Sequence, residues 1–107
     1  MPKYLVQVAY SPESWAAMVK HPQDRMEAVR PAVESIGGKF ESAYLAFGEY
    51  DLIGIIDFPD NVASAAFSID VASKGAVKAL KTTPLLTMDE SVAAMQKASS
   101  VSYTPPK

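Results

Sequence analysis

Few of the 107 residues belong to the types that carry chemistry. The chain has no cysteine, which excludes a thiolate nucleophile, a disulfide framework and a cysteine-ligated metal. His21 is the single histidine, and one histidine without cysteine does not make a zinc site, so we expect no metal and no cofactor. An imidazole titrates near neutral pH, which makes His21 a candidate catalytic base, although a loop histidine beside Pro22 is more often simply solvated.

Residues 48–51, between two predicted strands, hold two further catalytic candidates, Tyr50 and Asp51. In a structural interpretation this is a turn motif, in which Gly48 takes a backbone conformation that other residues resist and Asp51 binds neighbouring amides. In a functional interpretation Tyr50 and Asp51 supply a phenol and a carboxylate at the mouth of a pocket, where they can move a proton. The structural interpretation is favoured for Asp51 and the functional one for Tyr50, because a turn does not itself require an aromatic ring.

Trp15, Arg25 and Lys81 are candidate ligand-binding residues, together with Tyr50. Trp15 has the helical spacing of a core residue, but on a pocket wall it would suit a planar or apolar ligand. Arg25 is most simply a solvated helix charge, yet facing a cleft it could bind a carboxylate through two parallel hydrogen bonds. Lys81 could mark an anion site at the end of a strand, although lysines on edge strands commonly prevent unwanted strand pairing.

The elements that must position these residues follow from the apolar pattern and the capping signals. Strands are predicted over residues 4–10, 39–47, 52–58 and 76–80, the last continuing as far as Thr83 before Pro84. Helices are predicted after the N-cap Ser11, over 22–36, between Asp60 and Gly75, and from Thr87. Residues 1–98 are expected to form one domain, and 99–107 a tail.

The element order β-α-β-β-α-β plus a short C-terminal helix predicts an α+β, ferredoxin-like fold. In it a four-stranded antiparallel sheet carries the main helices on one face. Simple alternation puts Phe40 and Tyr44 on the same side of their strand, and it makes residues 52–58 apolar on both sides. The uncovered face would then expose a large apolar surface. We therefore expect a homo-oligomer, at least a dimer, of the dimeric α/β-barrel type.

The chain resembles the GYD-domain proteins, small bacterial and archaeal proteins named for a Gly, a Tyr and an Asp at the 48–51 turn. The similarity covers roughly residues 3–96, and it is carried by separated motifs that fall in order: residues 3–6, Trp15, residues 22–25, 37–38, Pro59 and 81–83. The resemblance implies a ferredoxin-like fold of the dimeric-barrel type. It implies no reaction, because the family is generally described as of unknown function.

Composition narrows the class of function. Hydrophobic residues make up 49% of the chain and charged residues 21%, a mix typical of globular proteins. The formal net charge of −2 and the absence of a basic cluster argue against nucleic acid as a partner. No apolar run is long enough for a membrane span, and the first residues do not resemble a signal peptide, so we expect a cytoplasmic protein without a membrane partner. The resemblance to the GYD-domain proteins implies a bacterial one.

The function that these observations favour is binding of a small organic ligand in a pocket between the sheet and the helices. One alternative is a cofactor-independent monooxygenase- or isomerase-like enzyme that uses a tyrosine or the histidine. Another is a structural protein whose role is assembly. The sequence leaves open whether a ligand is also turned over. A well-formed pocket favours the first two hypotheses, and polar groups converging inside it would favour the enzyme.

Overall fold

The computed structural model describes residues 1–107 and contains four strands and four helices. In chain order they are β1 (Lys3–Tyr10), α1 (Pro12–Lys20), α2 (Arg25–Ser35), β2 (Lys39–Leu45), β3 (Leu52–Asp57), α3 (Asn61–Ser73), β4 (Val77–Leu85) and α4 (Met88–Ala98). The strands form one antiparallel sheet in the order β2-β3-β1-β4. This arrangement confirms the ferredoxin-like α+β fold, with α1 and α2 together forming the first crossover.

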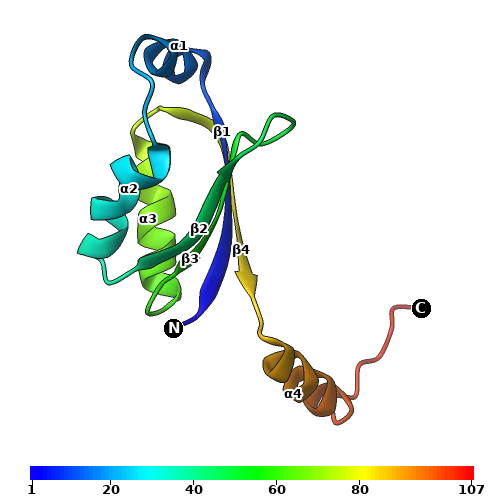
Figure 1. Ribbon diagram of the computed structural model, residues 1–107. Helices are drawn as coiled ribbons and strands as arrows, with labels where there is room; N and C mark the ends of the chain where they lie inside the picture. Colours follow the sequence, from blue (N-terminus) through cyan, green and yellow to red (C-terminus); the bar gives the residue numbers. More distant parts are fainter.

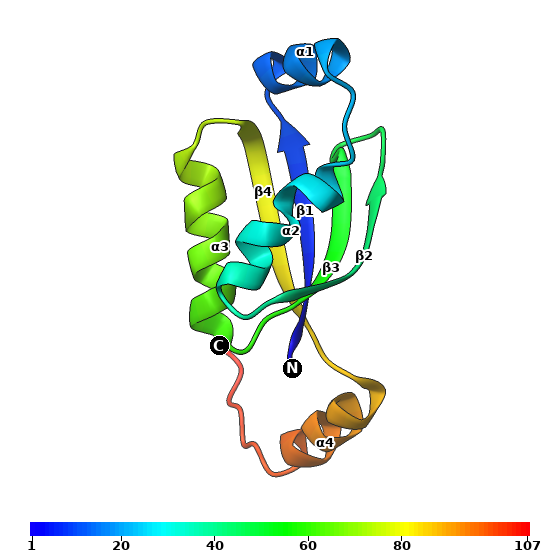
Figure 2. The same cartoon turned by 60° about the vertical axis from the view of Figure 1, so that its left-hand side comes forward.

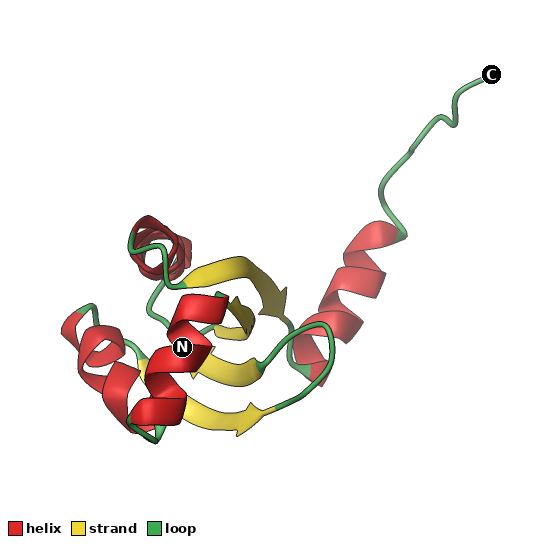
Figure 3. Cartoon of the chain, turned by 90° about the horizontal axis from the view of Figure 1, so that it is seen from above, coloured by secondary structure: helices red, strands yellow, loops and turns green.

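The helices are distributed unevenly about the sheet. Helices α2 and α3 lie on one face, and α1 sits beyond the end of β1 (Figures 1 and 2). Helix α4 projects away from the body beyond the end of β4, on the side opposite α2 and α3 (Figures 1 and 3). One face of the sheet is therefore covered by helices of the same chain, and the other face is open.

Side-chain caps fix where the helices begin. Ser11 accepts a hydrogen bond from the Ser14 amide at 3.2 Å, and Pro12 occupies the first turn of α1, as predicted. Helix α2 begins at Arg25, three residues later than the predicted start, because the Asp24 carboxylate caps its first turn. Helix α4 begins with the predicted capping box, in which Thr87 and Glu90 bond each other's backbone amides.

The core lies between the helix-covered face and the helices α2 and α3. Alternate side chains of β1 point into it, as strand geometry requires. At its centre the Phe58 ring packs edge-on against Tyr4, with ring centroids 5.7 Å apart. The buried hydrophobic cluster consists of Tyr4, Val6, Val8, Tyr10, Val33, Phe40, Ile56, Phe58 and Phe67.

A β-bulge in β2 overturns the predicted face of Phe40. Phe40 pairs with the buried Ile56, but the register shifts before Ser42, so that Tyr44 pairs with Ile53 on the other face. Phe40 is accordingly 7% exposed and Tyr44 72% exposed. The prediction that the two aromatic residues share a face was wrong, because one extra residue in a strand inverts the alternation after it. The strand also ends at Leu45, two residues earlier than predicted.

Pro84 does not end β4 as predicted, whereas Gly37 marks the end of α2. Strand β4 runs through Pro84 to Leu85, beyond its predicted end. It is an edge strand, where a proline is tolerated because an outward-facing amide has no ladder hydrogen bond to lose. Gly37 follows α2 with a φ of 82°, the left-handed conformation expected of a glycine at a helix end. The next residue, Gly38, is packed so closely that a Cβ there would lie 2.8 Å from Val33 Cγ1.

Apolar side chains also occur outside the core. The open face of the sheet, defined as the side chains that alternate with the buried ones, carries Leu5, Gln7, Tyr44, Ile53, Ile55 and Lys81. In α4, Met88, Val92 and Met95 form an exposed stripe at helical spacing. None of the helices has both the length and the apolar character that crossing a membrane would require.

Candidate ligand-binding site

A cavity of about 240 Å³ lies between the helix-covered face of the sheet and the helices α2 and α3. Of its 18 lining residues, 14 are hydrophobic, so the cavity suits an apolar group. The floor is made by inward-facing residues of β1, β2 and β3, namely Val6, Val8, Phe40, Ala43, Leu52, Gly54 and Ile56. The walls come from α2 and α3, the two helices in front of the sheet in Figure 2.

Short side chains line the rim and the floor of the cavity. Ala28 and Ala32 lie one turn apart on α2, and both line the cavity while remaining exposed. The cavity is therefore open to solvent beside α2. Gly54 lies in the floor, between Val6 of β1 and Ala43 of β2, and a Cβ there would lie 3.2 Å from the Ser42 carbonyl oxygen. The glycine thus permits the close packing of the floor.

Three charged side chains line the cavity: Arg25, Asp70 and Lys74. Lys74 Nζ lies 3.3 Å from Asp70 Oδ1 along α3, so these two charges neutralise each other. Arg25, the first residue of α2, is half-buried, and its Nη1 donates to Gln23 Oε1 at 2.6 Å. Its Nε is buried and has no hydrogen-bond partner in the chain. Arg25 is therefore the one cation of the cavity without a carboxylate to pair with.

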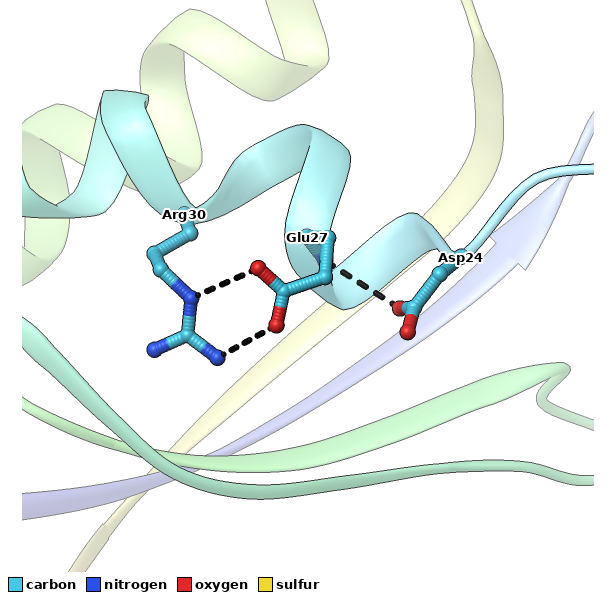
Figure 4. Close-up of polar contacts among 3 residues, drawn as sticks. All are labelled: Asp24, Glu27 and Arg30. Atoms are coloured by element: carbon cyan, nitrogen blue, oxygen red, sulfur yellow. Dashed lines mark hydrogen bonds and ion pairs between the residues drawn. The ribbon is translucent and has the colours of Figure 1, made fainter.

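Asp24 and Glu27, the acidic residues nearest to Arg25 in the sequence, form hydrogen bonds with other residues of α2 (Figure 4). The Asp24 carboxylate accepts from the Glu27 amide at 3.1 Å as the helix cap. The two oxygens of Glu27 accept from Arg30 Nε at 3.1 Å and Nη2 at 2.9 Å, and this hydrogen-bonded pairing raises the pKa of Arg30. Within α2, Glu27 thus pairs with Arg30 and Asp24 caps the helix, so neither carboxylate pairs with Arg25.

Trp15 lies beside the cavity rather than in it. It packs edge-on against Tyr10, with ring centroids 5.5 Å apart, and with Met18 it lines a neighbouring groove of about 340 Å³. Arg25 lines both the groove and the cavity. The structure therefore brings Arg25 and Trp15, two of the predicted ligand-binding residues, to adjoining surfaces at the start of α2.

The 48–51 loop lies apart from the cavity and is tied to β1. The Asp51 carboxylate accepts from the buried Tyr10 amide at 2.9 Å, and the Asp51 amide donates to the Val8 carbonyl at 2.8 Å. Tyr50 is half-buried and lines neither the cavity nor the groove. The expected special conformation of Gly48 was wrong: its φ is not positive, and a Cβ added there would meet nothing within 4 Å.

His21 and Lys81 also lie outside the cavity. His21 caps the end of α1, is exposed, and donates its backbone amide to the Ala17 carbonyl at 2.9 Å. Lys81 pairs in register with Gln7, which places it on the open face of the sheet, opposite the cavity. Gln23 connects His21 to Arg25, because its Nε2 donates to the His21 carbonyl at 3.2 Å and its Oε1 accepts from Arg25 Nη1 at 2.6 Å, whereas Lys81 lies on the other face of the sheet.

Sequence reasoning missed the small residues that create the cavity and the ion pair at its far side. Ala28 and Ala32 were available as a signal, since two alanines at i, i+4 spacing give a helix a face with short side chains. Asp70 and Lys74 have the same spacing on α3. Their position on the cavity wall depends on how α3 lies against the sheet, which the linear spacing does not specify.

Comparison with known proteins agrees with this architecture. The family model of the GYD domain matches residues 4–95, and the chain therefore belongs to the GYD-domain family. No curated protein matches the chain.

Two solved structures share the fold. The crystal structure of FFRP-DM1 superimposes with a TM-score of 0.52 at 14% identity, covering 80% of this chain and 100% of the other. That of a hypothetical protein, PHS023, from Pyrococcus horikoshii gives a TM-score of 0.51 at 14% identity, with 81% of this chain and 92% of the other covered. At such low identity the likeness shows the fold alone.

Proposed function

We propose that this GYD-domain protein binds a small organic ligand in the cavity between the sheet and the helices α2 and α3. The observation that carries the proposal is an apolar cavity of about 240 Å³ directly on the hydrophobic core, with a single unpaired cation at its wall. Concave, mostly apolar sites with few polar groups are the usual form of a small-molecule site. The cavity also argues against a role in assembly alone, for which a solid core would suffice.

The size of the cavity limits the ligand. An apolar cavity of roughly 150 Å³ is large enough to bind benzene, and drug-sized ligands occupy roughly 300–1,000 Å³. At about 240 Å³ the present cavity lies between these values. It therefore suits a single substituted ring or a chain of about six carbons rather than a nucleotide or a polycyclic cofactor.

Binding is supported more strongly than catalysis. A proton-transfer enzyme needs an acid or base within hydrogen-bond reach of the substrate. The three catalytic candidates of the sequence, Tyr50, Asp51 and His21, do not line the cavity. The Asp51 carboxylate is moreover occupied by the Tyr10 amide. A monooxygenase- or isomerase-like activity remains the second hypothesis, without a converging set of groups in its favour.

A neutral probe tests the cavity itself. Titration with 1-hexanol, followed by methyl NMR, is expected to shift the resonances of Val6, Val29 and Val71, which line the cavity. Ala32→Phe places a ring at the rim of the cavity, where Ala32 is exposed, and should weaken these shifts. Ala66→Phe is the matched control, because Ala66 is likewise an exposed helical alanine but does not line the cavity. Binding of 1-hexanol that is unchanged in Ala32→Phe, or that is absent from the unmodified protein, would contradict the proposal.

We also propose that the chain binds a second copy of itself through the open face of the sheet. Leu5, Ile53 and Ile55 lie side by side there, next to the exposed Tyr44. An apolar face of this kind on a small protein is typical of an interaction surface. Sedimentation at micromolar concentration should give a mass of at least twice 11.5 kDa, and a single 11.5 kDa species would contradict self-association.

A further inference from the structure

The unpaired edge of the Arg25 guanidinium is the feature of the cavity that the apolar wall does not explain. Nη1 is occupied by Gln23 Oε1, whereas Nε is buried without a partner. Burying a charged donor without an acceptor costs free energy that a folded protein ordinarily avoids. Nη2 forms no hydrogen bond with the chain and, unlike Nε, is not covered by it, so Nη2 is the donor that an external carboxylate can reach.

Arg30, on the same helix, shows which group a guanidinium binds when an acceptor of the chain is within reach. Arg30 uses its Nε and Nη2 to hold the two oxygens of Glu27, at 3.1 and 2.9 Å (Figure 4). Asp24 and Glu27, the acidic residues nearest to Arg25 in sequence, are committed to the helix cap and to Arg30. No carboxylate of the chain forms an ion pair with Arg25, so an acceptor for its free edge has to come from outside the chain.

The charge of the cavity wall sets the charge of the ligand. Arg25 and Lys74 contribute two positive charges and Asp70 one negative charge, which leaves one positive charge in excess. Lys74 and Asp70 are already paired with each other at 3.3 Å. Both side chains of that pair are mostly exposed, at 67% and 61%, so Arg25 is the half-buried charge of the wall. A singly charged anion would neutralise it, whereas a dianion such as a phosphate monoester would carry one negative charge more than the wall has unpaired cations. The other lining residues offer mostly hydrocarbon surface.

We infer that the ligand is a small monocarboxylic acid with an apolar body. This inference rests on the proposed function. The carboxylate accepts a charge-assisted hydrogen bond from Nη2 of Arg25, and the apolar body lies over Val6, Gly54 and Ile56 on the floor of the cavity. Arg25 thus selects an acid over a neutral molecule of the same shape, and the volume of the cavity limits its length.

Hexanoate and 1-hexanol test this selection, because they share a chain length and differ in the head group. At pH 7 hexanoate is expected to bind about tenfold more tightly than 1-hexanol, the difference expected of a charge-assisted contact. Arg25→Gln should abolish this preference, so that hexanoate and 1-hexanol bind the variant with equal affinity. Arg30→Gln is the matched control, since that arginine is on the same helix but does not line the cavity, and it should keep the preference.

The possible outcomes separate the two proposals. If both probes bind the unmodified protein equally, the carboxylate inference is wrong while the cavity remains a binding site. If neither probe binds, the proposed function fails and the inference fails with it. A preference for hexanoate that survives Arg25→Gln would also overturn the role of Arg25. The comparison of the two probes on the unmodified protein needs no variant, so it holds even where a substitution impairs folding.

Discussion

The hydrogen bond from the Tyr10 amide to the Asp51 carboxylate is expected to hold the 48–51 loop against β1. The two atoms are 2.9 Å apart, and Tyr10 is only 5% exposed, so water cannot replace the carboxylate. Asp51→Ala leaves a buried amide without an acceptor, at a cost of about 1–3 kcal/mol in the free energy of unfolding. For a domain of this size, a loss of roughly 2 kcal/mol lowers the melting temperature by about 10 °C.

Asp51→Asn removes the negative charge of residue 51 and keeps the shape of its side chain. The amide oxygen of asparagine can still accept from Tyr10, so the loss should be about 1 kcal/mol or less. Glu49→Ala, in the same loop and exposed, is the control and should change stability by less than about 0.5 kcal/mol. Thermal melting followed by circular dichroism, with a urea titration of each variant, gives the comparison. An Asp51→Ala variant that melts with the unmodified protein would refute the structural interpretation of this residue.

Three further perturbations follow from the structure. Tyr44→Glu puts a charge on the open face of the sheet, where the side chain is 72% exposed, and should release monomer in sedimentation without lowering monomer stability. Gly38→Ala brings a methyl group 2.8 Å from Val33 Cγ1 and should cost about 1–3 kcal/mol in urea unfolding. The hydrogen bond to Asp57 raises the pKa of Lys3 from 10.5, so this pair stabilises the fold below that pH and is lost as pH rises through the folded pKa. Lys3→Met should therefore remove part of the alkaline destabilisation, as measured by melting between about pH 9 and 12.

Local signals were sufficient to predict most of the fold. Ser11 and the Thr87–Glu90 capping box begin helices where predicted, because their side chains bond amides only a few residues away. The alternation of apolar residues gave the wrong face for Tyr44, after the bulge in β2, and the predicted end of β4 before Pro84 was too early. Both depend on the neighbouring strand, either through the register against β3 or through the edge position of β4. A pattern within one segment carries no information about such pairings.

Of the four candidate ligand-binding residues, only Arg25 lines the cavity. Arg25 was a candidate for carboxylate binding from its chemistry, and the structure places it on the wall of an apolar cavity. Lys81 was a candidate on similar grounds, yet it lies on the opposite face of the sheet, because its register with Gln7 decides which way it points. The cavity is lined by residues of three strands and two helices, so its volume depends on how α2 and α3 lie against the sheet.

The most direct test of the binding site is where a bound acid contacts the protein. Isotope-filtered NOE measurements on the hexanoate complex should connect the hexanoate methyl group to Val6, Val29 and Val71, which line the cavity. They should show no contact with Ile55, which lies on the open face of the sheet. Contacts to Ile55 in place of the cavity valines would mean that apolar ligands use the open face, and they would contradict the site described above.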